Sequence, residues 1–266
     1  MEIPHDEWYA AIGKRRSRRR FDSRPVEPEL VKRMEAVCDG FRPFAEARAL
    51  LVARPAHEVV KGVVGNYGQV RGAPAYVAMV GDMGSPYVHE RVGYTGEGVV
   101  LEATALGLGT CWVGGFFRPE VAGRLLGIRD GERVLAVIPF GYPGGRTWEE
   151  AVMTGFARSH RRKPLGEMVD PADESRWPPW AKAALEAARL SPSAVNRQPW
   201  HFTVEPDGIT VSVSGIGDTW GIARRLDCGI AMLHIEVAAL FQGVRGHWEP
   251  LPPPCVARFK VRDALR

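Results

Sequence analysis

The chain has 266 residues, of which 45% are hydrophobic and 25% are charged, the composition of an ordinary soluble globular protein. Its four cysteines contain no Cys-x-x-Cys pair, which excludes a disulfide framework and favours a reducing compartment. The net charge of +4 arises from six cations between Lys14 and Arg20, and no apolar run is long enough to cross a bilayer. A basic patch that is so local suits one phosphate or a small anion, and we therefore expect no nucleic-acid partner. Because the apolar runs are short, we also expect no membrane association.

The segment Ser17 to Phe21 is similar to a twin-arginine export signal. The residues that follow it, Asp22 to Glu27, are polar where an export signal has an apolar segment. We therefore expect a cytoplasmic protein.

The first half of the chain mixes helix and strand patterns. Its expected elements are an amphipathic helix (Pro25 to Val37), two strands (Ala49 to Arg54 and Ala75 to Val80), a helix that is apolar on most faces (Glu97 to Leu108) and a buried strand (Val134 to Phe140). A Pro- and Asp-rich linker around 170–179 then separates two expected units, residues 1–168 and 177–266.

The second half resumes a similar order. We expect a helix (Trp180 to Arg189), a hairpin (Phe202 to Glu205 and Ile209 to Ser214), an apolar helix (Cys228 to Phe241) and a final strand (Val256 to Val261). Leu101 to Leu106 aligns without gaps on Ile235 to Leu240, which indicates an internal repeat. The alternative is that any two α+β segments align this well.

Common catalytic signatures are missing from the sequence. It contains no Gly-x-Gly-x-x-Gly, no Walker lysine motif, no Gly-x-Ser-x-Gly and no histidine or cysteine spacing typical of a metal site. Cys111 is either a nucleophile or a core thiol, and its apolar surroundings favour the core.

Three segments suit neither a core nor a solvated surface. Arg15 to Arg19 offers guanidinium groups and a hydroxyl to a phosphate, unless it is a solvated helix end. Ser191 to Trp200 presents Ser, Asn and Gln on a proline-stiffened loop, unless it only connects a helix to a strand. Gly107 to Phe116 is a glycine-dense turn, whose backbone can approach a flat ligand closely.

Together these segments resemble the FMN-dependent nitroreductase family over roughly Trp8 to Trp248. The resemblance implies an α+β fold, a nitroreductase-like α-β-α sandwich, with FMN as cofactor and NAD(P)H as electron donor. It implies a phosphate site made by Arg15, Arg16, Ser17, Arg19, Arg161 and Lys163. It places the ring and ribityl chain against Pro192, Ser193, Ala194, Asn196, Gln198 and the backbone of Val113, Gly114 and Gly115, with Arg71 at the pyrimidine edge.

The order of these motifs differs from the usual family pattern. The Pro-Ser-x-x-Asn loop occurs only in the second half, and the matching place in the first half holds Phe41 to Ala47, without Asn or Gln. The resemblance is therefore to internally duplicated members, in which two degenerate repeats form a pseudo-dimer in one chain, and it implies a monomer with one composite site. The expected reaction transfers hydride from NAD(P)H through flavin to a nitroaromatic, quinone or similar small-molecule acceptor. Two alternatives remain open: a non-redox FMN-binding or sequestering protein, and a basic nucleic-acid adaptor.

Overall fold

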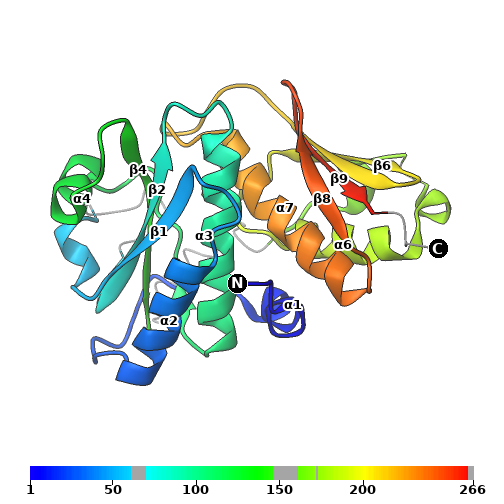
Figure 1. Ribbon diagram of the computed structural model, residues 1–266. Coiled ribbons are helices and arrows are strands. Elements are labelled where there is room, and N and C mark those ends of the chain that lie inside the picture. The colour runs from blue at the N-terminus through cyan, green and yellow to red at the C-terminus, as the bar shows by residue number, and fades with distance from the viewer. Residues whose placement is uncertain (61–69, 146–160, 172, 263–266) are drawn as a thin grey trace.

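Two sheets lie on opposite sides of a central group of helices (Figure 1). The computed structural model describes residues 1–60, 70–145, 161–171 and 173–262. Its α-helices are α1 (His5–Lys14), α2 (Pro28–Gly40), α3 (Val88–Ala105), α4 (Pro119–Leu126), α6 (Pro179–Arg189) and α7 (Arg224–Phe241). Its strands are β1 (Ala47–Val52), β2 (Ala75–Asp82), β3 (Gly109–Thr110), β4 (Glu132–Gly141), β5 (Val169–Asp170), β6 (Trp200–Glu205), β7 (Gly208–Val213), β8 (Gly246–Pro250) and β9 (Cys255–Val261).

The two sheets are built in the same order from the two halves of the chain. The first sheet has the strand order β1-β2-β4-β3, and all its neighbours are antiparallel. The second has the order β5-β6-β7-β9-β8, in which only the short β5 pairs in parallel. The first sheet takes two strands before its long central helix, α3, and two after it; the second takes β5, β6 and β7 before α7 and two strands after it, so the orders match except for the extra β5.

Helices cover both faces of the first sheet. Val77 and Met79 of β2 belong to the core that contains α2 and α3, whereas Tyr76 and Ala78 belong to a second core that contains α4. In this half of the chain the layers have the α-β-α order that the family resemblance implies. Along β6, buried and half-buried residues alternate, because one face of the second sheet packs against α6 and α7.

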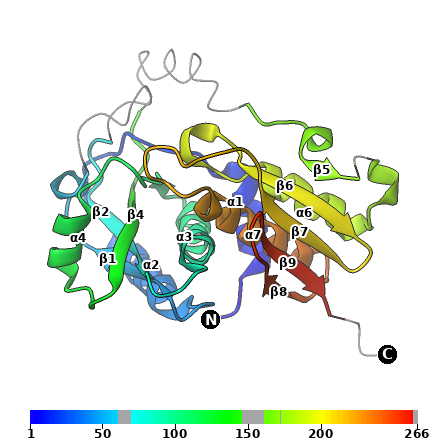
Figure 2. The ribbon, with the colours of Figure 1, turned by 90° about the horizontal axis from the view of Figure 1, so that it is seen from above.

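The two apolar helices α3 and α7 pack side by side at the centre of the molecule, as both views show (Figure 2). Their backbones meet at two glycines. A Cβ atom on Gly93 would lie 2.0 Å from the carbonyl oxygen of Leu226, and one on Gly229 would lie 1.9 Å from that of Glu90. Only glycine permits this approach.

Gly93 explains one of two errors in the predicted boundaries. We expected the two helices to begin at Glu97 and Cys228, but they begin at Val88 and Arg224. The glycines before Glu97 disfavour a helix locally, and close packing against α7 outweighs that preference. Likewise α2 begins at Pro28, not at Pro25, and the short elements α1, α4 and β8 are missing from the expectation.

Replacing Gly229 by Ala is expected to lower the free energy of unfolding by about 1–3 kcal/mol or more, because the new methyl group overpacks the helix crossing. Gly13→Ala is the matched control. No atom of the described part of the chain lies within 4 Å of a Cβ at this exposed helical position, so the change should be neutral or slightly stabilising. Urea denaturation of both variants measures the difference, and equal midpoints would contradict the close approach.

No helix among residues 1–60, 70–145, 161–171 and 173–262 is long and apolar enough to cross a membrane.

Candidate functional site

The basic segment that follows α1 runs beside β3 and residue 71. The N–H of Arg18 donates to the carbonyl of Thr110 over 2.7 Å, and that of Phe21 donates to the carbonyl of Arg71 over 3.0 Å. The N–H of Arg71 in turn donates to the carbonyl of Arg19 over 2.8 Å. The fold therefore brings Arg71 and the turn after β3 next to the predicted phosphate motif.

Arg15 is buried, with 6% of its surface exposed. Burial lowers the pKa of its guanidinium, an effect that Arg16 adds to and that Glu97 opposes. Among the described residues, its Nε–H has no hydrogen-bond acceptor. A buried cation with an unsatisfied donor is costly, and an anion on this side chain would satisfy it.

Arg162 joins the two halves of the chain at this point. Its guanidinium donates to Oδ1 of Asn196 over 2.5 Å and to the carbonyl of Leu190 over 3.3 Å. Burial, together with the nearby charges of Arg15 and Arg16, lowers its pKa to about 10. The cations of the first half and the Asn loop of the second half therefore lie close to the same side chain.

Arg162 is a residue that the sequence prediction missed, since Arg161 and Lys163 on either side of it were assigned to the phosphate. Arg161 is exposed, and its carbonyl accepts hydrogen bonds from the Asn196 and Gln198 side chains at 2.8 and 3.1 Å. Lys163 donates its backbone N–H to Oε1 of Gln198 over 2.9 Å. The only available signal was that these three basic residues are consecutive, which does not distinguish among them.

The amides of Asn196 and Gln198 thus hold the segment 161–163 in place. Gln198 is 4% exposed, and its side chain also donates to the carbonyl of Asn196 over 3.2 Å. The hydroxyl of Ser193 accepts the N–H of Gln198 over 2.9 Å. Pro192 is buried, whereas Ser193, Ala194 and Asn196 are half-buried. The most accessible part of the loop is therefore its Ser193–Asn196 stretch.

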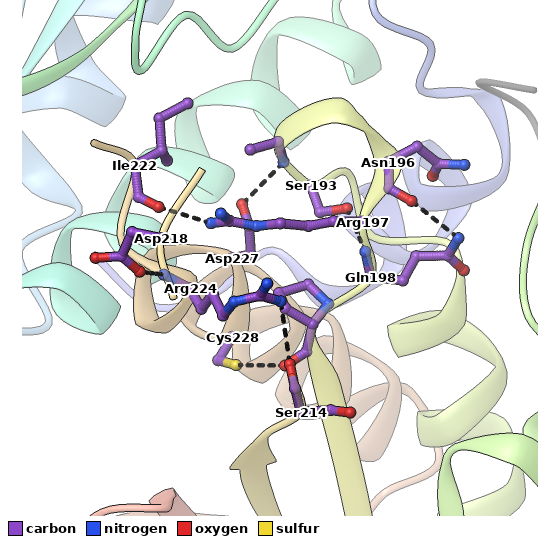
Figure 3. A network of polar contacts seen from close by, with 12 residues as sticks. Ser193, Asn196, Arg197, Gln198, Ser214, Asp218, Ile222, Arg224, Asp227 and Cys228 are labelled. Carbon is purple, nitrogen blue, oxygen red and sulfur yellow. Dashed lines mark hydrogen bonds and ion pairs between the residues drawn. The ribbon is translucent and has the colours of Figure 1, made fainter. Parts of the chain in front are cut away.

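This loop has an unusual backbone. Val195, Asn196 and Gln198 have φ angles of 49°, 55° and 46°, in the left-handed region that disfavours side chains, above all the β-branched valine. Buried Asp227 holds the loop from below: its carboxylate accepts the N–H of Ala194 over 3.1 Å and Nε of Arg197 over 2.7 Å (Figure 3). Such strain persists only where the surroundings impose it, and it is common at ligand-binding sites.

The glycine turn faces the second half of the chain. The N–H of Val113 donates to the carbonyl of Val137 over 2.9 Å, so this residue is anchored to β4 and its N–H is not free for a ligand. Among the described residues, Gly114 and Gly115 have no such partner for their N–H groups. A Cβ on either glycine would lie 3.3 Å from the Ile222 side chain. Of the three residues whose backbone was predicted to contact the flavin, only Gly114 and Gly115 therefore remain as candidate N–H donors.

A buried polar group connects this turn to the central helices. Glu97 of α3 accepts Nε1 of Trp112 over 2.8 Å, and its other oxygen lies 3.0 Å from Nε2 of His234 on α7. Glu97 and His234 are fully buried. Nearby Cys111 is also buried and belongs to the core beside β2 and β4, as its apolar surroundings indicate, and burial raises the pKa of its thiol.

The structure places the remaining predicted residues near these segments. Arg16 is exposed and donates to the carbonyl of Gly13 over 3.0 Å. Ser17 is exposed and pairs with Thr110 in a parallel bridge. Parts of two predicted segments, residues 67–69 and 158–160, lie outside the described residues.

Asp227 gives the site a pH dependence whose sign can be worked out. Burial raises its pKa from 3.8 to about 6, although Arg197 opposes this. Between about pH 4 and pH 6 the folded protein therefore holds a proton that the unfolded chain has lost. The contribution of this carboxyl to stability is complete below about pH 4 and is lost as the pH rises through about 6.

Asp227→Asn is expected to remove this dependence, so that from about pH 4 to pH 7 the variant gains up to about 3 kcal/mol relative to the native chain. Chemical denaturation of both proteins over this pH range measures the difference. Parallel pH profiles would contradict the assignment.

Comparisons with known proteins agree with the fold. Residues 7–239 match the family described as "Putative TM nitroreductase". A "putative nitroreductase" from Thermotoga maritima superposes with a TM-score of 0.66 at 20% identity, covering 98% of this chain and 96% of its own. A nitroreductase family protein from Clostridium difficile 630 has a TM-score of 0.43 at 20% identity and covers 60% of this chain and 94% of its own. No curated protein matches the sequence.

Proposed function

On the premise that the chain belongs to the TM nitroreductase family, and so to the oxidoreductases, we propose that it binds one FMN. The bound flavin would transfer hydride from NAD(P)H to a small-molecule acceptor. The acceptor is a nitroaromatic, a quinone or a similar compound. The observation that carries the proposal is the buried Arg15, whose Nε–H lacks an acceptor among the described residues beside two further cations, Arg16 and Arg162.

These residues fit the phosphate end of FMN. A phosphate dianion beside Arg15 would satisfy the buried donor and reduce the repulsion that lowers the pKa of Arg162. Arg16 and Arg19 lie on the same segment, and Arg71 is bonded to it through the backbone. Several converging cations compensate for the charge of a dianion better than a single ion pair does.

Two further segments fit the flavin ring. Gly114 and Gly115 offer two backbone N–H donors. Because neither residue has a side chain, a flat ring can approach the backbone closely here. The half-buried Ser193–Asn196 stretch of the strained loop supplies further polar groups. Bound FMN would supply the hydride chemistry, and the protein's own residues would bind and orient it.

We also propose that the chain arose by internal duplication and that only one of its two equivalent places retains a site. Apart from the additional β5, the strand order of the two sheets is the same, which supports a repeat. In the first half, the place of the Asn loop is filled by apolar packing: Phe41 lies 5.1 Å from Trp8 and Phe44 lies 5.2 Å from Tyr94, centroid to centroid. This proposal predicts a monomer with one FMN, because the helix pair that would join two subunits is already formed within the chain. We also propose a cytoplasmic location, as the sequence indicates.

The purified protein tests this proposal. We expect a flavin absorption band, one FMN released per chain on denaturation, a monomeric mass by light scattering, and bleaching of the band by NADH or NADPH under anaerobic conditions. Bound flavin that no pyridine nucleotide reduces would favour the sequestering alternative. A colourless protein that FMN does not saturate would contradict the proposal.

A further inference from the structure

We propose that Asp227 and Arg197 are positioning residues, which hold the loop from Ser193 to Gln198 in its left-handed conformation so that it can receive the flavin. This inference rests on the proposed function, because it concerns the same site. It assigns a role to two residues that the sequence motif leaves without one.

The contacts of the pair connect three separate segments (Figure 3). The Asp227 carboxylate on α7 accepts from the Ala194 backbone and from the Arg197 side chain, both in the loop. The same guanidinium donates to the carbonyl of Ile222 over 3.0 Å. Since Ile222 packs against Gly114 and Gly115, the pair fixes the loop relative to the turn that would contact the opposite side of the ligand.

The connecting segment before α7 is itself held in a defined shape. Arg224 donates to the carbonyls of Ser214 and Ile216 over 3.1 and 3.0 Å, and to that of Gly217. Its backbone N–H donates to Asp218 over 3.0 Å. The Ile222 carbonyl that accepts from Arg197 therefore belongs to a segment of defined conformation, so this hydrogen bond can fix the position of the loop relative to that segment.

Stability alone gives a poor reason for this pair. The side chains of Arg197 and Asp227 are 7% and 2% exposed. The free energy needed to remove both charges from water offsets much of their electrostatic attraction. In keeping with this, burial raises the pKa of Asp227 despite its partner, and Nη1 of Arg197 has no acceptor among the described residues. What the pair provides is geometry: it directs the N–H of Ala194 and the backbone around Val195 into a conformation that the local sequence disfavours.

The test compares Asp227→Asn with Glu90→Gln. Glu90 is a matched control because it forms the same kind of buried pair with a residue of α7, Arg225, at 2.6 and 3.0 Å. Arg225 bonds otherwise to the carbonyls of Cys255 and Val256, away from the loop. For each variant we would measure FMN affinity by fluorescence titration, the melting temperature, and hydrogen exchange of peptides that contain residues 193–198 in the FMN-free protein.

We expect Asp227→Asn to weaken FMN binding about tenfold or more, equivalent to about 1.4 kcal/mol or more, and to speed exchange in the loop. Glu90→Gln should change the melting temperature without either effect. Because the two side chains act together, their effects should not add. The double variant Asp227→Asn/Arg197→Met should therefore bind FMN no more weakly than whichever of the single variants, Asp227→Asn or Arg197→Met, has the lower affinity.

An Asp227→Asn protein with native loop exchange, or with an affinity loss no larger than that of Glu90→Gln, would overturn the inference. If the native chain binds no FMN, the proposed function fails, and the exchange comparison still decides whether the pair holds the loop.

Discussion

Replacing Arg15 and Arg19 together by Ala is expected to weaken FMN binding by at least about a hundredfold, since each charge-assisted hydrogen bond contributes about 1.5–3 kcal/mol. The chain should remain folded, because the segment after Arg15 is held by backbone bonds to Thr110 and Arg71 that the substitutions leave in place. Removal of the buried Arg15 cation also eliminates a donor that has no acceptor within residues 1–60, 70–145, 161–171 and 173–262, which limits the cost in stability. Titration with FMN and thermal unfolding of the same samples separate the two effects.

The matched control is Arg124→Ala/Arg129→Ala, which removes the same charge from exposed positions in and after α4. This variant should bind FMN like the native chain. If the Arg15/Arg19 variant also keeps its affinity, the phosphate does not lie at this segment. If both variants lose affinity equally, the effect is one of overall charge and the site assignment is wrong.

Residues 1–165 expressed alone are expected to aggregate and to bind no FMN. The fragment would expose the face of α3 that packs against α7, and it would leave Glu97 without His234. It would also lack the loop from Ser193 to Gln198. Solubility, light scattering and flavin content of the purified fragment measure these losses.

Co-expression of residues 1–168 with 177–266 provides the control. If the central helix pair is the structural unit, the two pieces should associate into a complex that binds one FMN. A soluble, folded fragment 1–165 that binds FMN by itself would show that the site is not composed of both halves.

Local sequence was sufficient for the helices and strands that carry a strong pattern. Val134 to Phe140 lies within β4, and Trp180 to Arg189 lies within α6, because apolar periodicity reports burial directly. The predicted start of α3 was wrong where Gly93 serves the contact with α7, since a local preference cannot report a partner that is distant in the chain. The family resemblance likewise rested on contiguous motifs, which can be read without a fold.

The sequence by itself therefore determined which segments carry donors and cations, and the order in which they occur. Only the tertiary structure decided which of them act together. Arg162 meets Asn196 across 34 residues, Asp227 meets Arg197 across 30, and Glu97 meets His234 across 137. Each pair is brought together by tertiary packing, Glu97 and His234 by that of α3 against α7. The energy of a buried polar contact depends on such packing and not on the residues beside it in the chain.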